Sequence, residues 1–430
     1  MRFTVEEILF FERDVKLRLP FRFGIVTLRE APQAFVRARI RLENGTEAEG
    51  ASAELLAPKW FDKNPALSNE ENFEQLRDSM RQAREAYVSG ENRTAYGHSR
   101  PTVGLVENFG PALLDRALLD ALCRALGISF YDAIRRDVVG MQLRHAFPQP
   151  STEIAARHTV GLVDPISSSG NRINDGLPET LEEVVARYGH RWFKLKVAGD
   201  VRADVERLSA IAGVLDRIAA PYQASLDGNE QYEDIEGVRA LWRAIEAAPR
   251  LQRLAASIVF IEQPIKRQTA FSKPVSMEKP VIIDESDDSL DAFPRAKALG
   301  YRGVSSKTCK GIYKSLTNAA RCAQWGSDYF MTGEDLTIQA GLALQQDLAL
   351  VSLLGLAHVE RNGHHYVNGM AGLPNGEQQD FLHSHPDLYE KAHGAVRVKI
   401  AKGRMKLGSL DCPGFASRAM PDWSAMRSVQ

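Results

Sequence analysis

The sequence predicts an α/β protein built on a (β/α)8 barrel of the TIM type, with an α+β module before it. Three observations predict this class. Eight short apolar runs alternate with amphipathic, helix-like stretches between residues 158 and 360, the first 145 residues follow a different pattern, and several apolar runs end in a charged residue. Alternating strands and helices are typical of parallel sheets, and eight such units favour a closed barrel over an open sheet.

The N-terminal region, residues 1–145, reads as an antiparallel sheet followed by helices. Residues Phe35 to Leu42 alternate apolar and charged side chains, the pattern of a half-buried strand. Asn44-Gly45 then suits the positive φ angles of a hairpin turn. Two helices are expected next, from Asn69 to about Ala95 and from Pro111 to Leu126. We expect this region to form a capping domain.

The barrel is expected over residues 146–370, with boundaries accurate to about 2–4 residues. A loop rich in Ser, Gly and Asn, Ser167 to Pro178, follows the first strand, and the tail 371–430 is expected to pack back on the capping domain. The eight candidate strands are His158–Val163, Trp192–Val197, Tyr222–Asp227, Ser257–Glu262, Val281–Asp284, Gly303–Lys307, Tyr329–Thr332 and Leu356–Glu360.

The composition favours a small-molecule partner in the cytoplasm. Of the 430 residues 44% are hydrophobic, and 54 basic residues nearly balance 55 acidic ones, so no basic surface for nucleic acid is expected. Glu6 and Glu7 stand where a signal peptide needs an apolar run. The longest apolar stretch, Leu336 to Ala357, contains Gln and Asp and is expected to be a buried barrel helix, not a membrane span. Four cysteines without CxxC spacing suggest a reducing compartment without structural zinc.

Three acids end three successive candidate strands: Asp227, Glu262 and Asp284. The C-terminal ends of barrel strands meet at one mouth, where barrel active sites form. Carboxylates that converge there repel each other unless a hard cation lies between them. Oxygen-only ligands point to Mg²⁺, or to Mn²⁺, and to Zn²⁺ less. The alternative is that these residues are solvated loop acids or lie behind the true ligands.

Three lysines flank the acids. Lys194 and Lys196 lie two residues apart, so both point to one face of the second strand, and Lys307 ends the sixth strand across the barrel. A lysine beside a cation or another ammonium group loses proton affinity and can serve as a general base near neutral pH. The alternative is that these lysines form salt bridges with nearby carboxylates.

In order, these motifs resemble the enolase superfamily, specifically its muconate-lactonising-enzyme-like subgroup in the mandelate racemase/muconate lactonising enzyme family. The motifs are Lys194-Leu-Lys196, Asp227-Gly-Asn229, Glu262-Gln-Pro264, Asp284-Glu-Ser286 and Lys307. Pro20-Phe21-Arg22-Phe23 and the following hairpin are similar to the capping domain of that superfamily. The resemblance covers nearly the whole chain.

The resemblance implies Mg²⁺ bound by Asp227, Glu262 and Asp284, and a substrate carboxylate held by the metal. Lys196 would remove the α-proton and give an enediolate, Lys307 would act as acid or base on the opposite face, and Lys194 would neutralise the carboxylate. Asn229 and Glu285 would lie beside the metal ligands. We expect an isomerase, a racemase or epimerase that uses both lysines, and a homo-oligomer. Cycloisomerisation, syn-dehydration and an inactive metal-binding scaffold are the alternatives.

Substrate contacts are expected from the last two strands. Glu334 is the candidate on the seventh strand, with Asp335 beside it, and His364 is the candidate after the eighth. The eighth strand lacks the Asp-x-Asp by which dipeptide epimerases of the subgroup bind an α-ammonium group, which argues against a dipeptide. His158 stands alone on the first strand, which argues against a metal-dependent hydrolase with a His-x-His motif.

Overall fold

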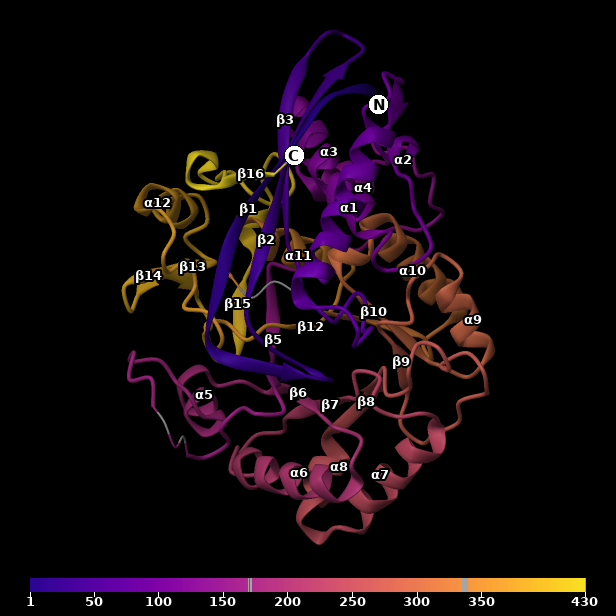
Figure 1. Cartoon of the computed structure of the whole chain (residues 1–430), viewed down its shortest axis with the longest axis vertical. Helices are drawn as coiled ribbons and strands as arrows, with labels where there is room; N and C mark the ends of the chain where they lie inside the picture. Colours follow the sequence, from indigo (N-terminus) through magenta and orange to yellow (C-terminus); the bar gives the residue numbers. More distant parts are fainter. Residues whose placement is uncertain (169, 171, 335–338, 430) are drawn as a thin grey trace.

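The computed structural model describes residues 1–168, 170, 172–334 and 339–429. Over this part of the chain it confirms the predicted class, a closed parallel barrel joined to an N-terminal antiparallel sheet domain (Figure 1). The two parts share one hydrophobic core, which runs from the N-terminal sheet into the barrel wall, while a second core fills the opposite half of the barrel.

The N-terminal sheet is dominated by a long hairpin. Its first two strands pair from Phe3↔Leu42 to Phe23↔Val26, and the expected Asn44-Gly45 turn connects the second strand to the third. The sheet order is β16-β1-β2-β3, where β16 is Arg427–Val429 near the C-terminus, and β4 lies at the side of β1. The strands are β1 (Arg2–Phe23), β2 (Val26–Leu42), β3 (Glu47–Leu55) and β4 (Arg93–Thr94).

Helices cover one face of this sheet. They are α1 (Asn69–Tyr87), α2 (Ala95–His98), α3 (Phe109–Leu126) and α4 (Phe130–Arg135). Ser68 and Glu71 form a reciprocal capping box at the start of α1. Helix α3 is almost wholly buried and crosses β3 so closely that a Cβ on Gly50 would lie 2.1 Å from the Ala121 nitrogen. Only glycine fits at this crossing.

The barrel contains eight parallel strands in the described residues, and pairing of β12 with β5 closes it. Seven strands begin within two residues of their predicted starts. The first begins at Glu153, five residues before the predicted His158, so it includes Arg157. The strands are β5 (Glu153–Val160), β6 (Trp192–Lys196), β7 (Gln223–Asp227), β8 (Ile258–Glu262), β9 (Val281–Ile283), β10 (Gly303–Ser306), β11 (Phe330–Gly333) and β12 (His358–Glu360).

The barrel helices are α5 (Leu181–Tyr188), α6 (Val201–Leu215), α7 (Ile235–Ala247), α8 (Gln252–Ser257), α9 (Ala292–Ala298), α10 (Ile312–Trp325) and α11 (Leu342–Leu353), with 3-10 turns at Pro249–Leu251 and Thr308–Lys310. Every residue of α11 is buried, in agreement with the expected buried helix. None of the helices in the described residues has the length and apolar character needed to span a membrane.

The C-terminal residues contact both parts of the molecule. Strand β15 (Arg404–Lys406) pairs with β5 of the barrel, and β16 (Arg427–Val429) pairs with β1 of the N-terminal sheet. Between the barrel and these strands lie α12 (Asn375–Ser384), the hairpin β13 (Tyr389–Ala392) and β14 (Ala395–Val398), and 3-10 turns at Gly408–Leu410 and Trp423–Ala425.

The β1–β2 hairpin reaches from the N-terminal sheet to the barrel (Figure 1). Two backbone hydrogen bonds attach it there: Leu162 N–H donates to the Arg22 carbonyl at 3.0 Å, and Arg18 N–H donates to the Tyr366 carbonyl at 2.7 Å. Leu162 follows β5 and Tyr366 follows β12. The hairpin tip is therefore held over the ends of these two strands.

Candidate active site at the barrel mouth

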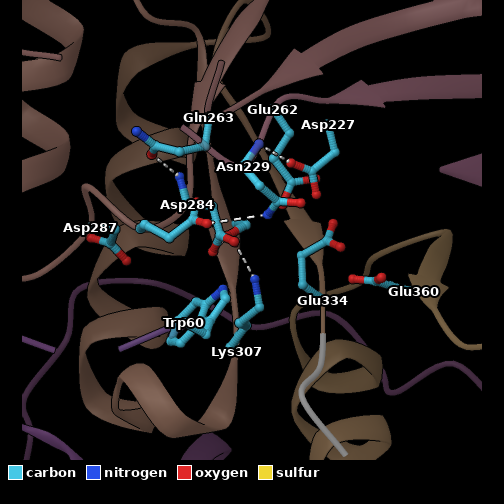
Figure 2. A network of polar contacts seen from close by, with 12 residues as sticks. Trp60, Asp227, Asn229, Glu262, Gln263, Asp284, Asp287, Lys307, Glu334 and Glu360 are labelled. Carbon is cyan, nitrogen blue, oxygen red and sulfur yellow. Dashed lines mark hydrogen bonds and ion pairs between the residues drawn. The ribbon is translucent and has the colours of Figure 1, made fainter. Parts of the chain in front are cut away.

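The three predicted acids lie at the mouth of the barrel. Asp227 and Glu262 are the last residues of β7 and β8 and are paired in register, and Asp284 follows β9 directly. All three side chains are buried. Figure 2 shows their carboxylates gathered around one space together with those of Glu334 and Glu360.

Tight backbone turns hold these acids at the strand ends. Gly228 lies so close to the next strand that a Cβ would meet Pro264 Cα at 2.6 Å. Asn229, Glu230 and Gln263 have positive φ angles, an unfavourable conformation that is concentrated at functional sites. The chain leaves β7 and β8 sharply, which keeps the acids at the mouth.

Polar side chains then orient the acids. The side-chain oxygen Oε1 of Gln263 accepts hydrogen bonds from the backbone N–H groups of Asp284 at 2.8 Å and of Ser286 at 3.0 Å, so the Glu-Gln-Pro motif positions the next strand end (Figure 2). Asn229 N–H donates to Asp227 Oδ1 at 2.9 Å, and the Asn229 amide donates to Glu285 Oε1 at 3.2 Å. The structure therefore places Asn229 and Glu285 beside the acids.

Lys194 lies at the centre of the acidic cluster. Its ammonium nitrogen is 2.9 Å from Asp227, 3.0 Å from Glu262, 2.8 Å from Glu334 and 3.0 Å from Glu360. Burial by itself lowers the pKa of Lys194, but the surrounding carboxylates outweigh burial and raise this pKa well above its usual value. Lys194 is thus fully engaged by the protein's own carboxylates.

Other lysines pair with Asp227 and with Asp284. Lys196 Nζ lies 2.6 Å from Asp227 Oδ2, Lys307 binds Asp284, and Lys310 Nζ lies 3.3 Å from Asp284 Oδ1. Burial lowers the pKa of Lys307, yet the Asp284 carboxylate opposes burial and the net shift is upward. Lys194 and Lys307 each lie nearer to a carboxylate than to another ammonium group, and without a cation beside them both hold their proton more firmly than an ordinary lysine.

Among the described residues, no three His, Cys, Asp or Glu side chains lie close enough together to hold a metal ion. The three predicted acids do not converge fully on one point. Lys194 lies between Asp227 and Glu262, and Asp284 pairs with Lys307 and Lys310. The donor set nevertheless suits Mg²⁺, since every acid offers carboxylate oxygen at a buried strand end. Burial, with the nearby charges of Asp227 and Asp284, raises the pKa of Glu262 to about 7 even though Lys194 opposes the shift. This position therefore favours additional positive charge.

Lys196 and Lys307 face the same cavity from opposite sides. They end β6 and follow β10, which are four strands apart in the ring of eight. The cavity is lined by Lys194, Lys196, Asp284, Lys307 and Glu360 at the barrel end. Side chains of the N-terminal domain form the facing wall.

Residues 176–418, more than half of the chain, match the family model described as enolase C-terminal domain-like. The chain belongs to this enolase family. Solved structures with this fold include N-succinyl Arg/Lys racemase from Bacillus cereus (TM-score 0.65, 16% identity, 100% of both chains covered). They also include a muconate lactonizing enzyme from Pseudomonas fluorescens complexed with muconolactone (0.63, 16%, 98% of this chain and 97% of that chain). A third is an enolase superfamily member from Roseovarius nubinhibens complexed with magnesium (0.60, 16%, 100% and 99%). No curated protein sequence matches the chain.

In this enolase-family barrel, two predicted substrate contacts are not among the residues that line the cavity. The Glu334 carboxylate binds Lys194 and Arg157 and accepts a hydrogen bond from Thr332, so it is enclosed by the barrel interior. The His364 imidazole packs against Tyr188, with ring centroids 4.8 Å apart, and does not line the cavity. Asp335 lies outside the described residues.

Three residues of this enolase-family site were missed from the sequence. Glu360 ends the eighth apolar run, so the rule that selected the other acids also applies to it. Burial raises the pKa of Glu360, but Lys194, Lys196 and Lys307 outweigh burial and lower it to about 2. Arg157, which binds Glu334, was missed because the first strand starts earlier than predicted, and Lys310, which pairs with Asp284, was missed because it lies beyond the end of the sixth apolar run.

Proposed function

We propose that this protein is a Mg²⁺-dependent isomerase that removes the proton α to a substrate carboxylate and returns a proton to the opposite face, as a racemase or epimerase. One observation carries the proposal: Lys196 and Lys307 line one cavity from opposite sides of the barrel. A substrate carbon between them can lose a proton to one lysine and gain one from the other.

Asp227, Glu262 and Asp284 are the residues that would hold Mg²⁺, with Mn²⁺ as an alternative ion for the same oxygen ligands. When bound, the ion supplies positive charge that stabilises the negative charge developing on the substrate's carboxylate oxygens. The magnesium complex of the Roseovarius nubinhibens protein, which has the same fold, supports this proposal. Movement of the Lys194 ammonium group out of the acidic cluster would open the space for the ion.

The lysines need opposite protonation states in each direction of the reaction. Lys307 is kept as an ammonium group by Asp284 and by Trp60, whose ring centroid lies 4.8 Å away, so it is set up to deliver a proton. Lys196 would then be the base that removes the α-proton on the other face. Lys196 Nζ lies 5.9 Å from the ring centroids of both Phe21 and Phe23, so these rings shield it from water.

The test is exchange of the substrate α-proton for deuterium in D₂O, monitored by NMR. The protein is incubated with Mg²⁺ and with each member of a panel of chiral carboxylic acids. We expect Mg²⁺-dependent exchange with both enantiomers of a substrate in the native protein. Lys196→Ala and Lys307→Ala should each retain exchange with one enantiomer only, and racemisation should fall by about 10²–10⁴-fold, the usual contribution of one general acid or base. Lys391→Ala, at an exposed position of β13, is the matched control and should behave as the native protein.

Other outcomes separate the alternative reactions. Exchange with one enantiomer only, together with loss of water or closure of a ring, would indicate syn-dehydration or cycloisomerisation with the same site. Absence of Mg²⁺-dependent exchange for the whole panel, with Lys196→Ala indistinguishable from the native protein, would contradict the proposed function and favour a binding scaffold.

A further inference from the structure

The cavity between Lys196 and Lys307 has two unlike ends. The barrel end carries the lysines and acids, whereas the N-terminal domain contributes only apolar and aromatic side chains: Phe21, Phe23, Leu28, Leu55, Ala57 and Trp60. Leu28, Leu55 and Trp60 are almost completely buried, with 2–3% of their surface exposed. A ligand that reaches the lysines therefore has its remaining part against hydrocarbon.

Tyr366 and Phe21 continue this apolar wall. Their ring centroids are 4.5 Å apart, and Phe21 is 5.1 Å from Phe23. The Tyr366 hydroxyl donates a hydrogen bond to Asp164 Oδ2 at 2.7 Å. The hydroxyl proton of Tyr366, a residue that also lines the cavity, is therefore already engaged within the protein.

The polar residues of the eighth-strand wall are also satisfied within the protein. The Asn362 amide donates to the Thr159 carbonyl at 2.9 Å, and its oxygen accepts from Thr159 N–H at 3.1 Å. Glu360 binds Lys194 and accepts from the Thr159 hydroxyl, and Arg361 forms an ion pair with Asp347 at 3.8 Å. Asn362 and Glu360 therefore have their polar groups engaged before a ligand arrives, and the charge of Arg361 is paired with Asp347.

This arrangement discriminates between classes of carboxylate. A hydroxyl or second carboxylate placed against the apolar wall would lose its hydrogen bonds to water and gain none there, which is unfavourable. An alkyl or aryl group would instead leave water for a matching surface, which is favourable. The lysines at the other end provide charge complementarity for one carboxylate.

We infer that the ligand of this cavity is a monocarboxylic acid whose remaining part is an uncharged aryl or branched alkyl group, selected by Leu28, Leu55 and the adjoining rings. This inference rests on the proposed function, because it takes the carboxylate to lie at the lysine end. It disfavours sugar acids and dicarboxylates as substrates.

The experiment measures binding by calorimetry and α-proton exchange by NMR, both with Mg²⁺ and the full-length protein. The probes are 2-phenylpropanoate, 4-methylpentanoate, glutarate and gluconate. We expect the two apolar acids to bind at least about tenfold more tightly than glutarate and gluconate, the scale on which an apolar pocket discriminates. Equal or tighter binding of either polar acid would overturn the inference, as would absence of binding by all four.

Variants locate the selectivity. Leu28→Asn and Leu55→Asn should each weaken binding of the apolar acids by about tenfold. The ratio of their affinity to that of gluconate should fall accordingly. Leu42→Asn is the matched control, since Leu42 is equally buried in β2 but lies at the other end of the strand and outside the cavity. If Leu42→Asn lowers the affinity of the apolar acids relative to gluconate as much as Leu28→Asn does, the apolar wall of the cavity has no selective role.

The two proposals fail in different ways. Exchange confined to polar acids would leave the proposed function intact and overturn the inference. Selective binding of apolar acids without exchange of any α-proton, including those of the wider panel, would support the inference and contradict the proposed function.

Discussion

Trp60 and Lys307 are in contact across the boundary between the N-terminal domain and the barrel, with the ammonium nitrogen 4.8 Å from the ring centroid. Trp60 follows β3, whereas Lys307 follows β10. The electron-rich face of the ring stabilises the ammonium form, and the ring also covers the lysine from solvent. The N-terminal domain thus completes the electrostatic environment of a barrel residue.

Replacement of Trp60 by leucine should lower the pKa of Lys307. A cation–π contact contributes about 0.5–2 kcal/mol, and 1.36 kcal/mol corresponds to one pKa unit, so we expect a fall of roughly one unit or less. The pH–rate profile of α-proton exchange measures this change as a shift of its alkaline limb to lower pH. Trp192→Leu is the control, because Trp192 stacks on His358 at the opposite end of the barrel strands. An unshifted limb in Trp60→Leu would show that the ring does not affect Lys307.

Magnesium should stabilise the protein through Glu262. An ion that binds only the folded state adds about 2.7 kcal/mol at a concentration one hundred times its dissociation constant, which raises the melting temperature. Thermal unfolding with increasing Mg²⁺ measures the effect, and chelation should reverse it. Glu262→Gln should abolish most of the increase, while Glu246→Gln, on the exposed face of α7, should retain it. A full increase in Glu262→Gln would exclude Glu262 as a ligand.

Acid should destabilise the protein through buried histidines. Burial lowers the pKa of His190 to about 4 and the pKa of His158 well below its usual value, and the two rings lie 5.3 Å apart. The unfolded chain binds protons at these histidines near pH 6.5, whereas the folded protein does not, so stability falls as the pH decreases below about 6.5. For His190 alone the loss by pH 4 is roughly 3 kcal/mol.

Urea unfolding at pH 7.5 and pH 5 measures this loss. His158→Phe should reduce the difference between the two pH values, because one of the buried titrating groups is removed. His393→Gln, at an exposed position, should leave the difference unchanged. If His158→Phe and the native protein lose the same free energy of unfolding, this cluster does not cause the acid sensitivity.

Arg116 joins the N-terminal domain to the barrel and should be important for stability. Its buried guanidinium lies 3.1 Å from each of three groups, Glu54 Oε2, the Ala53 carbonyl and Thr308 Oγ1. Removal of one partner of a buried ion pair typically costs about 3–5 kcal/mol, and we expect Arg116→Met to lie in this range. The free energy of unfolding in urea measures the cost.

Two further variants separate charge from packing at this junction. Arg116→Met combined with Glu54→Leu should recover part of the loss, because the carboxylate left without its guanidinium is then also removed. Arg39→Met, which breaks a 3.8 Å ion pair with exposed Glu7, should change stability by less than about 0.5 kcal/mol. A cost for Arg116→Met as small as that for Arg39→Met would contradict the proposed importance of Arg116.

Most of the correct predictions of strands and strand-end acids depend on the pattern of apolar and charged residues within short segments. The residues that end β7, β8 and β9 were identified because apolar runs of strand length stop at an acid, and this pattern depends only on neighbouring residues. The same reasoning would have selected Glu360. Arg157 was missed because the sequence of residues 153–157 has no clear strand pattern. Pairing with β12 in the folded barrel makes this segment a strand.

The sequence by itself determined the barrel, its N-terminal sheet and the order of acids and lysines around the mouth, since strand and helix periodicity are short-range properties. Only the tertiary structure decided how these side chains pair. It showed Lys194 among four carboxylates, removed His364 from the cavity, and brought Leu28, Leu55 and Trp60 against the lysines. These relationships join residues far apart in the chain, and they depend on how the hairpin and helices pack, which no local pattern specifies.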